Sequence, residues 1–410
     1  MMNKHLLSLV KLLVVAGLMY WVFSNIQLDD RLVRTTSAGA ETITEGSVVG
    51  EWDKPEIEFL EQGQTKPTKV TVAPEVRVRV GIVTYWRNIS LPWFLLGAFC
   101  YLMSVLFAAT RWWWLLRVNK LPIAFWSAYR FTWIGIFFNN VVPGQTGGDL
   151  VKAIYVMKRC EGARVPALMS VVVDRIMGLA SLSLLAAISV LFYLDNSEFL
   201  NLAILLWAVL GMVILFGVVA FSRRVRTLIR LKQLLEMLPD RIGSLLRRID
   251  QAVYFYRQHK RGMALWLFGG IFNHISSVCS YACVGMALGV GMPFANYFVL
   301  IPVIVTVSAI PIAPNGWGVG EFLFKELFSK FGAAHLSSVS SVVASHTMGT
   351  RGVALSIVYR IHLTAWSMVG GVLYFLDKDK VSRQDLAAEA ERGPVEGSAV
   401  DEPTAGEESG

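Results

Sequence analysis

Two short segments of the sequence combine residue types that can bind an anionic group. PGQTGGDL (143–150) and PNGWGVGEF (314–322) each contain a proline, then glycines, then a carboxylate that precedes an apolar run. Glycines let the backbone turn and bring amide groups close to a ligand. Asp149 and Glu321 are predicted to begin the second helix of each segment, where a negative charge meets the positive end of the helix dipole. The pattern predicts two half-helix breaks with a binding site between them.

Charged residues inside the apolar segments are candidates for the same site. Asp174 and Arg175 stand in the run VVVDRIMG, and Arg360 stands in the last apolar run, which Arg351 begins. A charge at the bilayer centre costs about 3 kcal/mol on insertion scales, so these residues favour a polar cavity. The alternative is a structural pair, such as Asp174 with an arginine, that holds helices together. The full set of predicted ligand contacts is Asn139, Asn140, Pro143, Gly144, Gly147, Gly148, Asp149, Lys152, Asp174, Arg175, Gly316, Gly318, Glu321, Lys325, Arg351 and Arg360.

The sequence predicts no metal site, no cofactor and no catalytic residue. The cysteines, at positions 100, 160, 279 and 283, lack the spacing of a four-ligand site and are predicted to pack as small apolar side chains. His274 and His362 are predicted to make structural hydrogen bonds. Residues 144–148 lack the Gly-Lys-Ser/Thr ending of a phosphate-binding loop.

The composition is that of a membrane protein. The chain has 410 residues, of which 54% are hydrophobic and only 17% are charged, whereas soluble domains are about a quarter charged. A net charge of +8 can indicate nucleic-acid binding, but here basic residues crowd beside apolar runs, as in loops that meet anionic lipids. We predict a multi-pass protein of the cytoplasmic (inner) membrane, with both termini cytoplasmic and no nucleic-acid partner.

Six apolar runs are long enough to cross a bilayer as helices. They cover residues 6–23, 93–116, 168–194, 200–221, 263–289 and 352–376. A shorter helix is predicted over 336–349. RWWWLLRVNK (111–120) is predicted to form a basic, aromatic belt at the membrane interface.

The two breaks interrupt shorter apolar segments. Around the first, only 131–142 is continuously apolar between basic flanks, about half the length that a span needs. This predicts a re-entrant helical hairpin from the cytoplasmic face, and 297–331 predicts a second from the outer face. Irregular backbone survives at membrane depth only where it is buried in protein or lines a wet cavity. Opposed hairpins are typical of an inverted-repeat transporter; the alternative is that both breaks are turns outside the membrane.

The fold class that follows is an all-α polytopic membrane protein with about six full spans, two re-entrant helical hairpins in an inverted repeat, and a small β-rich extracytoplasmic insert. Residues 1–26 are the N-terminal membrane anchor, for which a cleaved signal peptide is the alternative. Residues 27–90 are the insert, with alternating runs such as TKVTV and VRVRV. Residues 91–376 are the transmembrane domain, in which 222–261 is a basic amphipathic interfacial helix or, alternatively, a helix packed as in soluble proteins. Residues 377–410 are an acidic, disordered cytoplasmic tail.

Four motifs carry a resemblance to a known family. FFNNVVPGQTGGDLVKAIYVMKR, VVVDRIMGL, SAIPIAPNGWGVGEFLF and IVYRI, in this order, resemble the transmembrane flippase domain of the lysylphosphatidylglycerol synthase family. The resemblance covers roughly residues 93–376. It implies translocation or handling of aminoacylated phospholipids, other lipids or glycolipids. Family members usually carry an arginine before the glutamate, where this chain has Gly320, and Lys325 is predicted to substitute in part.

These observations favour a lipid flippase or lipid transporter for an anionic phospholipid or glycolipid. Amides near Gly147 and Gly148 would receive a phosphate together with the basic candidates, and the acidic candidates would bind a cationic moiety or complete the charge network. An intramembrane transferase is the first alternative, with Asp149 or His274 as general base. The second is an accessory subunit that docks a partner enzyme through 27–90, and a homo-oligomer through the same insert is open. The sequence holds no counterpart of the synthases' aminoacyl-transferase domain, so lipid aminoacylation by this chain is not expected.

Overall fold

The computed structural model describes residues 29–35, 41–50, 52, 56–73, 75–141, 147–160, 162, 164–193, 197–221, 256, 259–308, 319–335, 341–379, 381–382 and 384–385. The predictions for the anchor 1–26, for most of the basic helix 222–261 and for the tail beyond 385 lie outside these residues. So do four of the predicted ligand contacts, Pro143, Gly144, Gly316 and Gly318.

Four of the described helices are long and apolar enough to cross a membrane. They are α3 (Leu91–Val118), α6 (Arg164–Val190), α11 (Lys260–Ala287) and α14 (Ser341–Leu376). A further apolar helix, α7 (Ser197–Phe221), lies beside α6. Large apolar side chains on the outside of these helices, among them Phe272 and Phe375, are more than half exposed. Such a surface suits a lipid environment, and the chain is a multi-pass membrane protein.

Each interrupted segment forms a pair of short helices, as predicted. The first pair is α4 (Phe125–Val141) and α5 (Gly147–Arg159), and the second is α12 (Phe294–Ser308) and α13 (Val319–Gly332). With 17, 13, 15 and 14 residues, these helices are shorter than the long apolar ones. The carboxylates Asp149 and Glu321 lie in the first turns of α5 and α13.

The prediction of a separate helix over 336–349 before the last span is wrong. Residues 341–376 form one continuous helix of 36 residues. Gly349 and Gly352 lie inside this helix and allow close packing against α13. A Cβ atom at Gly349 would lie 2.2 Å from Ser329 Oγ, and one at Gly352 would lie 2.6 Å from the Phe324 carbonyl oxygen. The helix accepts the entropic cost of glycine because only glycine lets the two helices approach this closely.

Residues within the predicted β-rich insert form a five-stranded antiparallel sheet. The strands are β1 (Asp30–Thr35), β2 (Glu41–Val49), β3 (Glu56–Glu61), β4 (Thr68–Thr71) and β5 (Val76–Arg79), in the order β4-β3-β2-β1-β5. Alternate residues form a small core of Leu32, Val48, Ile57, Phe59 and Val70. A short helix, α2 (Ile82–Arg87), connects the sheet to α3.

Two contacts tie the sheet to the elements that follow it. The buried Asp30 carboxylate accepts hydrogen bonds from the Val48 amide and the Gly81 amide, each at 2.5 Å, and from Thr84 Oγ1 at 2.7 Å. This carboxylate therefore joins β1, β2 and α2. Trp52 reaches the helices directly, because its ring centroid lies 5.1 Å from the guanidinium carbon of Arg351 on α14.

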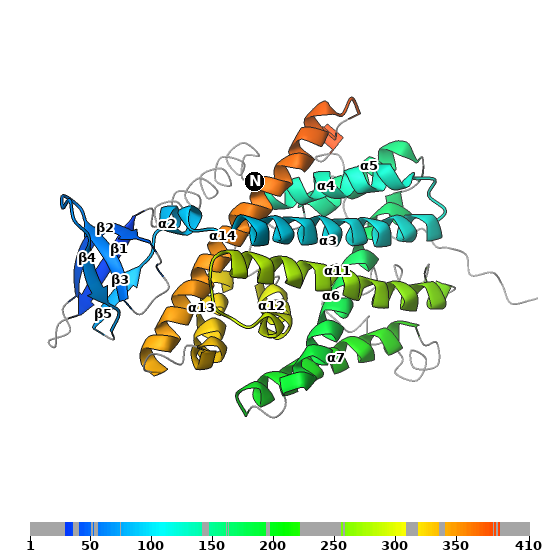
Figure 1. Ribbon diagram of the computed structural model, residues 1–410. Coiled ribbons are helices and arrows are strands. Elements are labelled where there is room, and N and C mark those ends of the chain that lie inside the picture. Colours follow the sequence, from blue (N-terminus) through cyan, green and yellow to red (C-terminus); the bar gives the residue numbers. More distant parts are fainter. Residues whose placement is uncertain are drawn as a thin grey trace, which may run out of the picture.

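Two long helices separate the two helix pairs. Helices α3 and α11 lie side by side and run in opposite directions, with α4 and α5 on one side of them and α12 and α13 on the other (Figure 1). Helix α4 packs against α14, and α12 packs against α6. The second short helix of each pair packs against the next helix in sequence, α5 against α6 and α13 against α14. Each pair thus contacts both the next helix in sequence and the corresponding helix from the other half of the chain.

Candidate functional site

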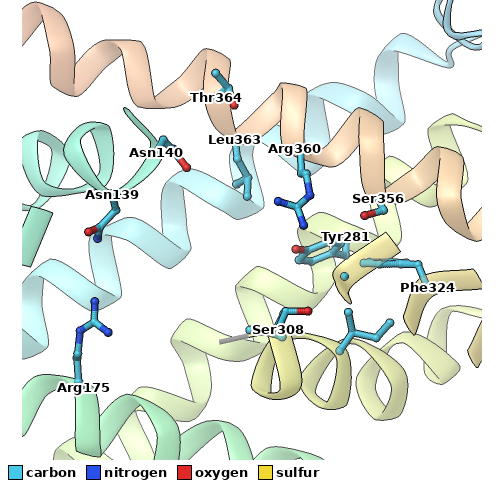
Figure 2. A pocket seen from close by; sticks show the side chains of 13 residues that line it. Asn139, Asn140, Arg175, Tyr281, Ser308, Phe324, Ser356, Arg360, Leu363 and Thr364 are labelled. Carbon is cyan, nitrogen blue, oxygen red and sulfur yellow. The ribbon is translucent and has the colours of Figure 1, made fainter. Parts of the chain in front are cut away.

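A cavity of about 350 Å³ lies where the two helix pairs approach each other (Figure 2). We call it the central cavity. Six helices line it: α4 and α6 from the first half of the chain, and α11, α12, α13 and α14 from the second. Its lining residues are Asn139, Asn140, Arg175, Tyr281, Ile304, Val305, Ser308, Gly320, Phe324, Ser356, Arg360, Leu363 and Thr364.

The lining combines cationic and neutral polar groups. Arg175 reaches in from α6 and Arg360 from α14, on different sides of the space (Figure 2). Amide and hydroxyl groups come from α4, α11, α12 and α14. Among the described lining residues there is no aspartate, glutamate, histidine or cysteine. The central cavity can therefore bind an anion and hydrogen-bond to neutral polar groups.

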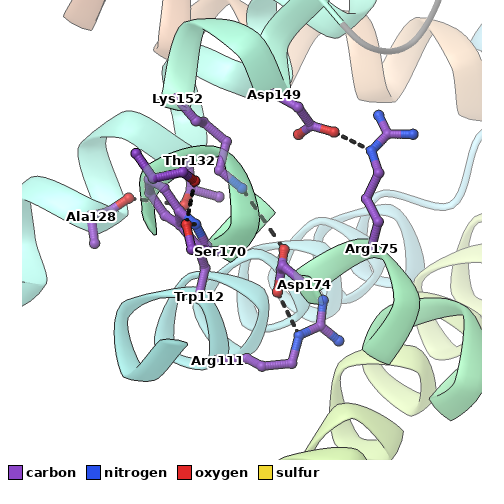
Figure 3. Close-up of polar contacts among 10 residues, drawn as sticks. Arg111, Trp112, Ala128, Thr132, Asp149, Lys152, Ser170, Asp174 and Arg175 are labelled. Carbon is purple, nitrogen blue, oxygen red and sulfur yellow. Dashed lines mark hydrogen bonds and ion pairs between the residues drawn. The ribbon is translucent and has the colours of Figure 1, made fainter. Parts of the chain in front are cut away.

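In the first half of the chain, an ion pair places Arg175 at the cavity. Asp149, in the first turn of α5, contacts Arg175 Nε on α6 (Figure 3). The start of α5 is also tied to α4, because the Gly148 amide donates to Asn139 Oδ1 at 2.9 Å. The amide that was predicted to meet a ligand thus bonds to a side chain that lines the cavity. Gly148 is needed for the close approach of the helices, since a Cβ there would lie 1.9 Å from the Gly135 carbonyl oxygen.

In the second half, the same arrangement recurs. Glu321, in the first turn of α13, contacts Arg360 Nε on α14 at 2.7 Å. A Cβ atom at Gly320 would lie 2.8 Å from Arg360 Nη2. The cation beside position 320 is therefore supplied by Arg360 from the neighbouring helix. Lys325, predicted to take that part, lies outside the cavity lining, and its side chain is 58% exposed beside Glu326.

A second group of charges lies beside the first ion pair but away from the cavity lining. Asp174 Oδ1 accepts from Arg111 Nε at 2.7 Å, and Asp174 Oδ2 lies 3.9 Å from Lys152 Nζ (Figure 3). Lys152 Nζ also lies 4.2 Å from the ring centroid of Trp112. These four side chains connect α3, α5 and α6 in the protein interior. Their contacts match the structural alternative for Asp174.

Arg111 was not foreseen as a partner in this group. As part of RWWWLLRVNK it was predicted to lie in an interfacial belt, yet Arg111 and Trp112 are both buried. The belt prediction is wrong for these two residues, because they face the interior of the helix bundle rather than its lipid side. The available signal was a cation within a long apolar helix, together with an aspartate inside another helix that needs a counter-charge.

Arg351 lies apart from the central cavity. Its side chain is buried, Nη1 donates to the Val290 carbonyl oxygen at 3.1 Å, and the guanidinium packs on Trp52. The structure thus places this predicted ligand contact between α14, the loop after α11 and the sheet. Gly147, the remaining predicted contact on α5, begins that helix and is not among the lining residues.

The two histidines of the long helices differ in their contacts. His274 Nε2 lies 2.9 Å from the Gly178 carbonyl oxygen and so links α11 to α6, as predicted. For His362 the prediction of a hydrogen bond is wrong within the described residues, where neither ring nitrogen has a partner. His362 is instead surrounded by aromatic rings, those of Phe94, Tyr101, Tyr359 and Trp366, at centroid distances of 5.3–6.5 Å. Within the part of the chain that the structure describes, no group of three or more His, Cys, Asp or Glu residues could hold a metal ion.

Comparison with known proteins gives two matches. The sequence model of a family described as "Lysylphosphatidylglycerol synthase TM region" matches residues 81–358. This match starts two residues after the end of β5 and includes both helix pairs. The UPF0104 membrane protein PH1989 of Pyrococcus horikoshii is 24% identical over 265 residues, which cover 60% of this chain and 79% of that protein.

Proposed function

The chain belongs to the lysylphosphatidylglycerol synthase transmembrane-region family, and from that premise we propose that it is a lipid flippase or lipid transporter of the cytoplasmic membrane. It moves a phospholipid or glycolipid between the two leaflets. The observation that carries this proposal is the polar central cavity, at which two interrupted helix pairs meet inside an apolar helix bundle. Polar and charged groups inside a bundle of long apolar helices are expected where a polar ligand is bound at membrane depth.

The arrangement of the helices supports an inverted repeat. Helices α3 to α6 and α11 to α14 have the same order: a long helix, a pair of short helices, and a second long helix. The two leading helices are antiparallel, and each short pair packs on the final helix of the other set (Figure 1). Transporters with inverted repeats bind their substrate at the interface of the repeats, near the bilayer midplane. We place the two short pairs as re-entrant hairpins that enter from opposite faces.

The two arginines of the lining are the proposed binding groups for the phosphate. In an apolar bundle, a guanidinium is costly and is usually found in a water-filled path or a ligand site. Arg175 and Arg360 each keep a carboxylate, Asp149 or Glu321, at Nε while they line the cavity. An anionic phospholipid or glycolipid would exchange contacts with these carboxylates as it enters. One half-site would receive it from each leaflet.

Transport is testable with purified protein in vesicles. Fluorescent phospholipid is incorporated, and its movement to the outer leaflet is followed by chemical quenching from outside. Lipid is expected to move faster in vesicles with wild-type protein than in protein-free vesicles. Arg175→Gln and Arg360→Gln are each expected to slow this movement about tenfold or more, as for a lost charge contact. Arg87→Gln, on the short helix α2, is the matched control. Movement no faster than in protein-free vesicles would contradict the proposal.

The same vesicles separate the two alternatives. Conversion of the lipid to a new species, seen by mass spectrometry, would instead support an intramembrane transferase. An accessory subunit would show itself by a partner enzyme that co-purifies with the full chain and is lost when the sheet is removed. Neither outcome is expected for a transporter that works through the central cavity alone.

A further inference from the structure

A second cavity, of about 460 Å³, lies between α6, α7 and α11. We call it the lateral pocket, and it shares no lining residue with the central cavity. Apart from Tyr256 and Lys260, its lining side chains are all aliphatic or methionine. We propose that the lateral pocket binds one acyl chain of an anionic phospholipid, whose head group lies at Lys260. This lipid is a bound one, separate from any lipid that passes through the central cavity.

The lateral pocket has the length of one membrane leaflet. Along α6 it extends from Val173 to Leu184, a rise of about 16 Å at about 1.5 Å per residue. One leaflet contributes about half of a hydrocarbon core that is about 30 Å thick. Tyr256 belongs to the same apolar cluster as Val173, and further along α6 Ser181 Oγ donates to the Leu267 carbonyl oxygen at 2.8 Å. The linings on α6 and α11 therefore run in the same direction, away from Tyr256.

The polar groups of the lining lie at one end of the pocket. Tyr256 is fully buried, and its hydroxyl accepts a hydrogen bond from Asn119 Nδ2, directly after the end of α3. Lys260 begins α11 and is exposed. An anion near Lys260 also meets the positive end of the α11 dipole. An apolar pocket with a cation at one end is complementary to an acyl chain that carries an anionic head group.

Aromatic side chains beside Lys260 indicate the depth of a membrane interface. The rings of Trp114 on α3 and Trp266 on α11 lie 6.2 Å apart. Gly262 permits this approach, because a Cβ atom there would lie 2.3 Å from the Trp114 ring. Tryptophan is enriched where a membrane protein meets the head groups. Lys260 therefore lies where a phosphate can reach it, with the rest of the pocket at the depth of the acyl chains.

The lateral pocket is open on one side, which suits a lipid with two chains. Helix α6 packs against both α7 and α11 and forms the floor of the pocket. On its walls, Ile214 of α7 is 56% exposed and Ala264 of α11 is also exposed. One acyl chain can therefore enter sideways from the membrane while the second chain stays in the bilayer.

The floor of the pocket is the helix that carries the first ion pair. Asp174 and Arg175 stand between the lining residues Val173 and Ile176 on α6. The chain in the lateral pocket thus packs against the back of the segment that holds Arg175 at the central cavity. A ligand that binds only the folded protein stabilises it, so this lipid is expected to stabilise α6 in its observed position.

Photolabelling of the full chain in vesicles tests the site. The probe is a trace of phosphatidylglycerol with a diazirine near the end of one acyl chain, and the vesicle lipid is changed from phosphatidylcholine to phosphatidylglycerol. Labelling around Leu184 is expected to fall about fivefold, the effect of one lysine on an anionic lipid, because the vesicle lipid now competes for the pocket. Labelling at Phe375, which is 70% exposed on α14, should not change. An equal response at both positions would show bulk lipid only and overturn the proposal.

A charge variant tests the role of Lys260. Lys260→Gln is expected to abolish the fall in labelling around Leu184, because anionic and zwitterionic lipids would then compete equally for the chain site. Arg261→Gln removes the neighbouring exposed cation, which is outside the lining, and should retain the fall. The same response from both variants would contradict the assignment of the head group to Lys260.

A variant that fills the pocket tests the chain site itself. Ala180→Phe adds a ring inside the lining and is expected to remove the labelling around Leu184 in both kinds of vesicle. Leu179→Phe places the same ring on the neighbouring position, which is 46% exposed and outside the lining, and should leave that labelling unchanged. Size-exclusion chromatography checks that both variants are folded. Undiminished labelling in folded Ala180→Phe would contradict the chain site, and the lysine variant tests it if Ala180→Phe does not fold.

Failure of this proposal is distinguishable from failure of the proposed function. A chain that moves no lipid but shows the fall in labelling would keep the lateral pocket as a lipid site. Transport without the fall would remove the site and leave the transporter. If protein from the same chain or from a second copy fills the pocket, labelling around Leu184 would be absent in both kinds of vesicle, and the proposal would be overturned.

Discussion

At the scale of single residues, Asp174 is the carboxylate on which two buried cations depend. It contacts Arg111 on α3 and Lys152 on α5, and neither cation is more than a tenth exposed. A buried ion pair contributes little net stability, but removal of one partner leaves the other charge uncompensated. Removal of Asp174 is therefore expected to destabilise the protein more than the intact ion pair stabilises it.

Asp174→Asn is expected to destabilise the protein by about 3–5 kcal/mol, because Arg111 and Lys152 would stay buried without a full counter-charge. Thermal unfolding in detergent, followed by tryptophan fluorescence, measures the loss. The double variant Asp174→Asn/Arg111→Gln should recover part of it. Asp379→Asn, beyond the end of α14, is the control. If the single variant unfolds like wild type, the charge group does not hold these helices together.

Asp30 makes the corresponding contribution in the sheet. Asp30→Ala would leave the Val48 amide, the Gly81 amide and Thr84 without their acceptor, and buried unsatisfied donors cost about 1–3 kcal/mol each. We expect faster hydrogen exchange at the amides of Val48 and Gly81, with helices α3 and α11 unaffected. Glu58→Ala, on the exposed face of β3, should leave these amides protected. Unchanged exchange in Asp30→Ala would show that the carboxylate does not join sheet and α2.

At the scale of elements, the pairing of α4 with α5 depends on two glycines. Gly148→Ala places a methyl group against the Gly135 carbonyl and is expected to cost about 1–3 kcal/mol or more, because neither helix backbone can yield easily. It should also slow lipid movement, since the start of α5 carries Asp149. Gly211→Ala, on α7, meets nothing within 4 Å and should be neutral or slightly stabilising. Equal stability of the two variants would contradict the close packing of this pair.

The segment after α14 is held to α4 and α5 by two aspartates. Asp377 contacts Arg130, and Asp385 contacts Lys158 at 2.6 Å. Burial alone would raise the pKa of Asp377, but hydrogen bonds from Arg130 and the Asp379 amide, with the charges of Arg130 and Arg159, hold that pKa below its usual value. The hydrogen bond from Lys158 lowers the pKa of Asp385 despite some burial.

Because both pKa values are lowered in the folded protein, these contacts stabilise docking above the ordinary aspartate pKa of about 4. The contribution is lost as the pH falls through the lowered values. A spin label at Lys378→Cys is therefore expected to be immobile at neutral pH and to become mobile only in acid. With Asp377→Asn and Asp385→Asn added, it should be mobile at every pH. A label equally mobile at pH 7 in both proteins would contradict docking by these pairs.

Which elements could be predicted from sequence depends on whether the signal is local. The long apolar runs, the alternating strands and the Pro/Gly breaks each lie within one stretch of chain, and in the part of the chain that the structure describes the corresponding helices and strands are present. The ion pairs Asp149–Arg175 and Glu321–Arg360 join residues 26 and 39 positions apart, so helix packing decides them. The separate helix over 336–349 was wrong because a short apolar stretch does not show whether the helix that contains it continues into the next one.

At the scale of the whole molecule, the two halves of the chain correspond across the central cavity. In each half, a carboxylate in the first turn of the second short helix holds an arginine of the next long helix at the cavity. The central cavity could not be located from sequence, since its lining comes from six helices spread over residues 139–364. Helices that flank the two predicted breaks contribute lining residues, but helix packing decides that they meet there.

The opposed halves make a prediction about membrane sides. The Ser90 amide, at the start of α3, donates to the Ala287 carbonyl oxygen at the end of α11, at 2.9 Å, so these two ends share one face. The loop after α3 must then emerge on the other face from the loop after α11. Basic residues near the end of α3 favour the cytoplasmic side for the loop after α3.

Cysteine labelling tests this arrangement. In a variant without the native cysteines, Lys120→Cys should react with a membrane-impermeant thiol reagent only from the cytoplasmic side, and Phe294→Cys only from outside. Both positions are accessible, at the loop after α3 and at the start of α12. Reaction of both cysteines from the same side would contradict the inverted repeat, and with it a cavity that opens to each leaflet in turn. If Lys120→Cys reacts only from outside and Phe294→Cys only from the cytoplasmic side, the repeat stands and only the orientation is overturned.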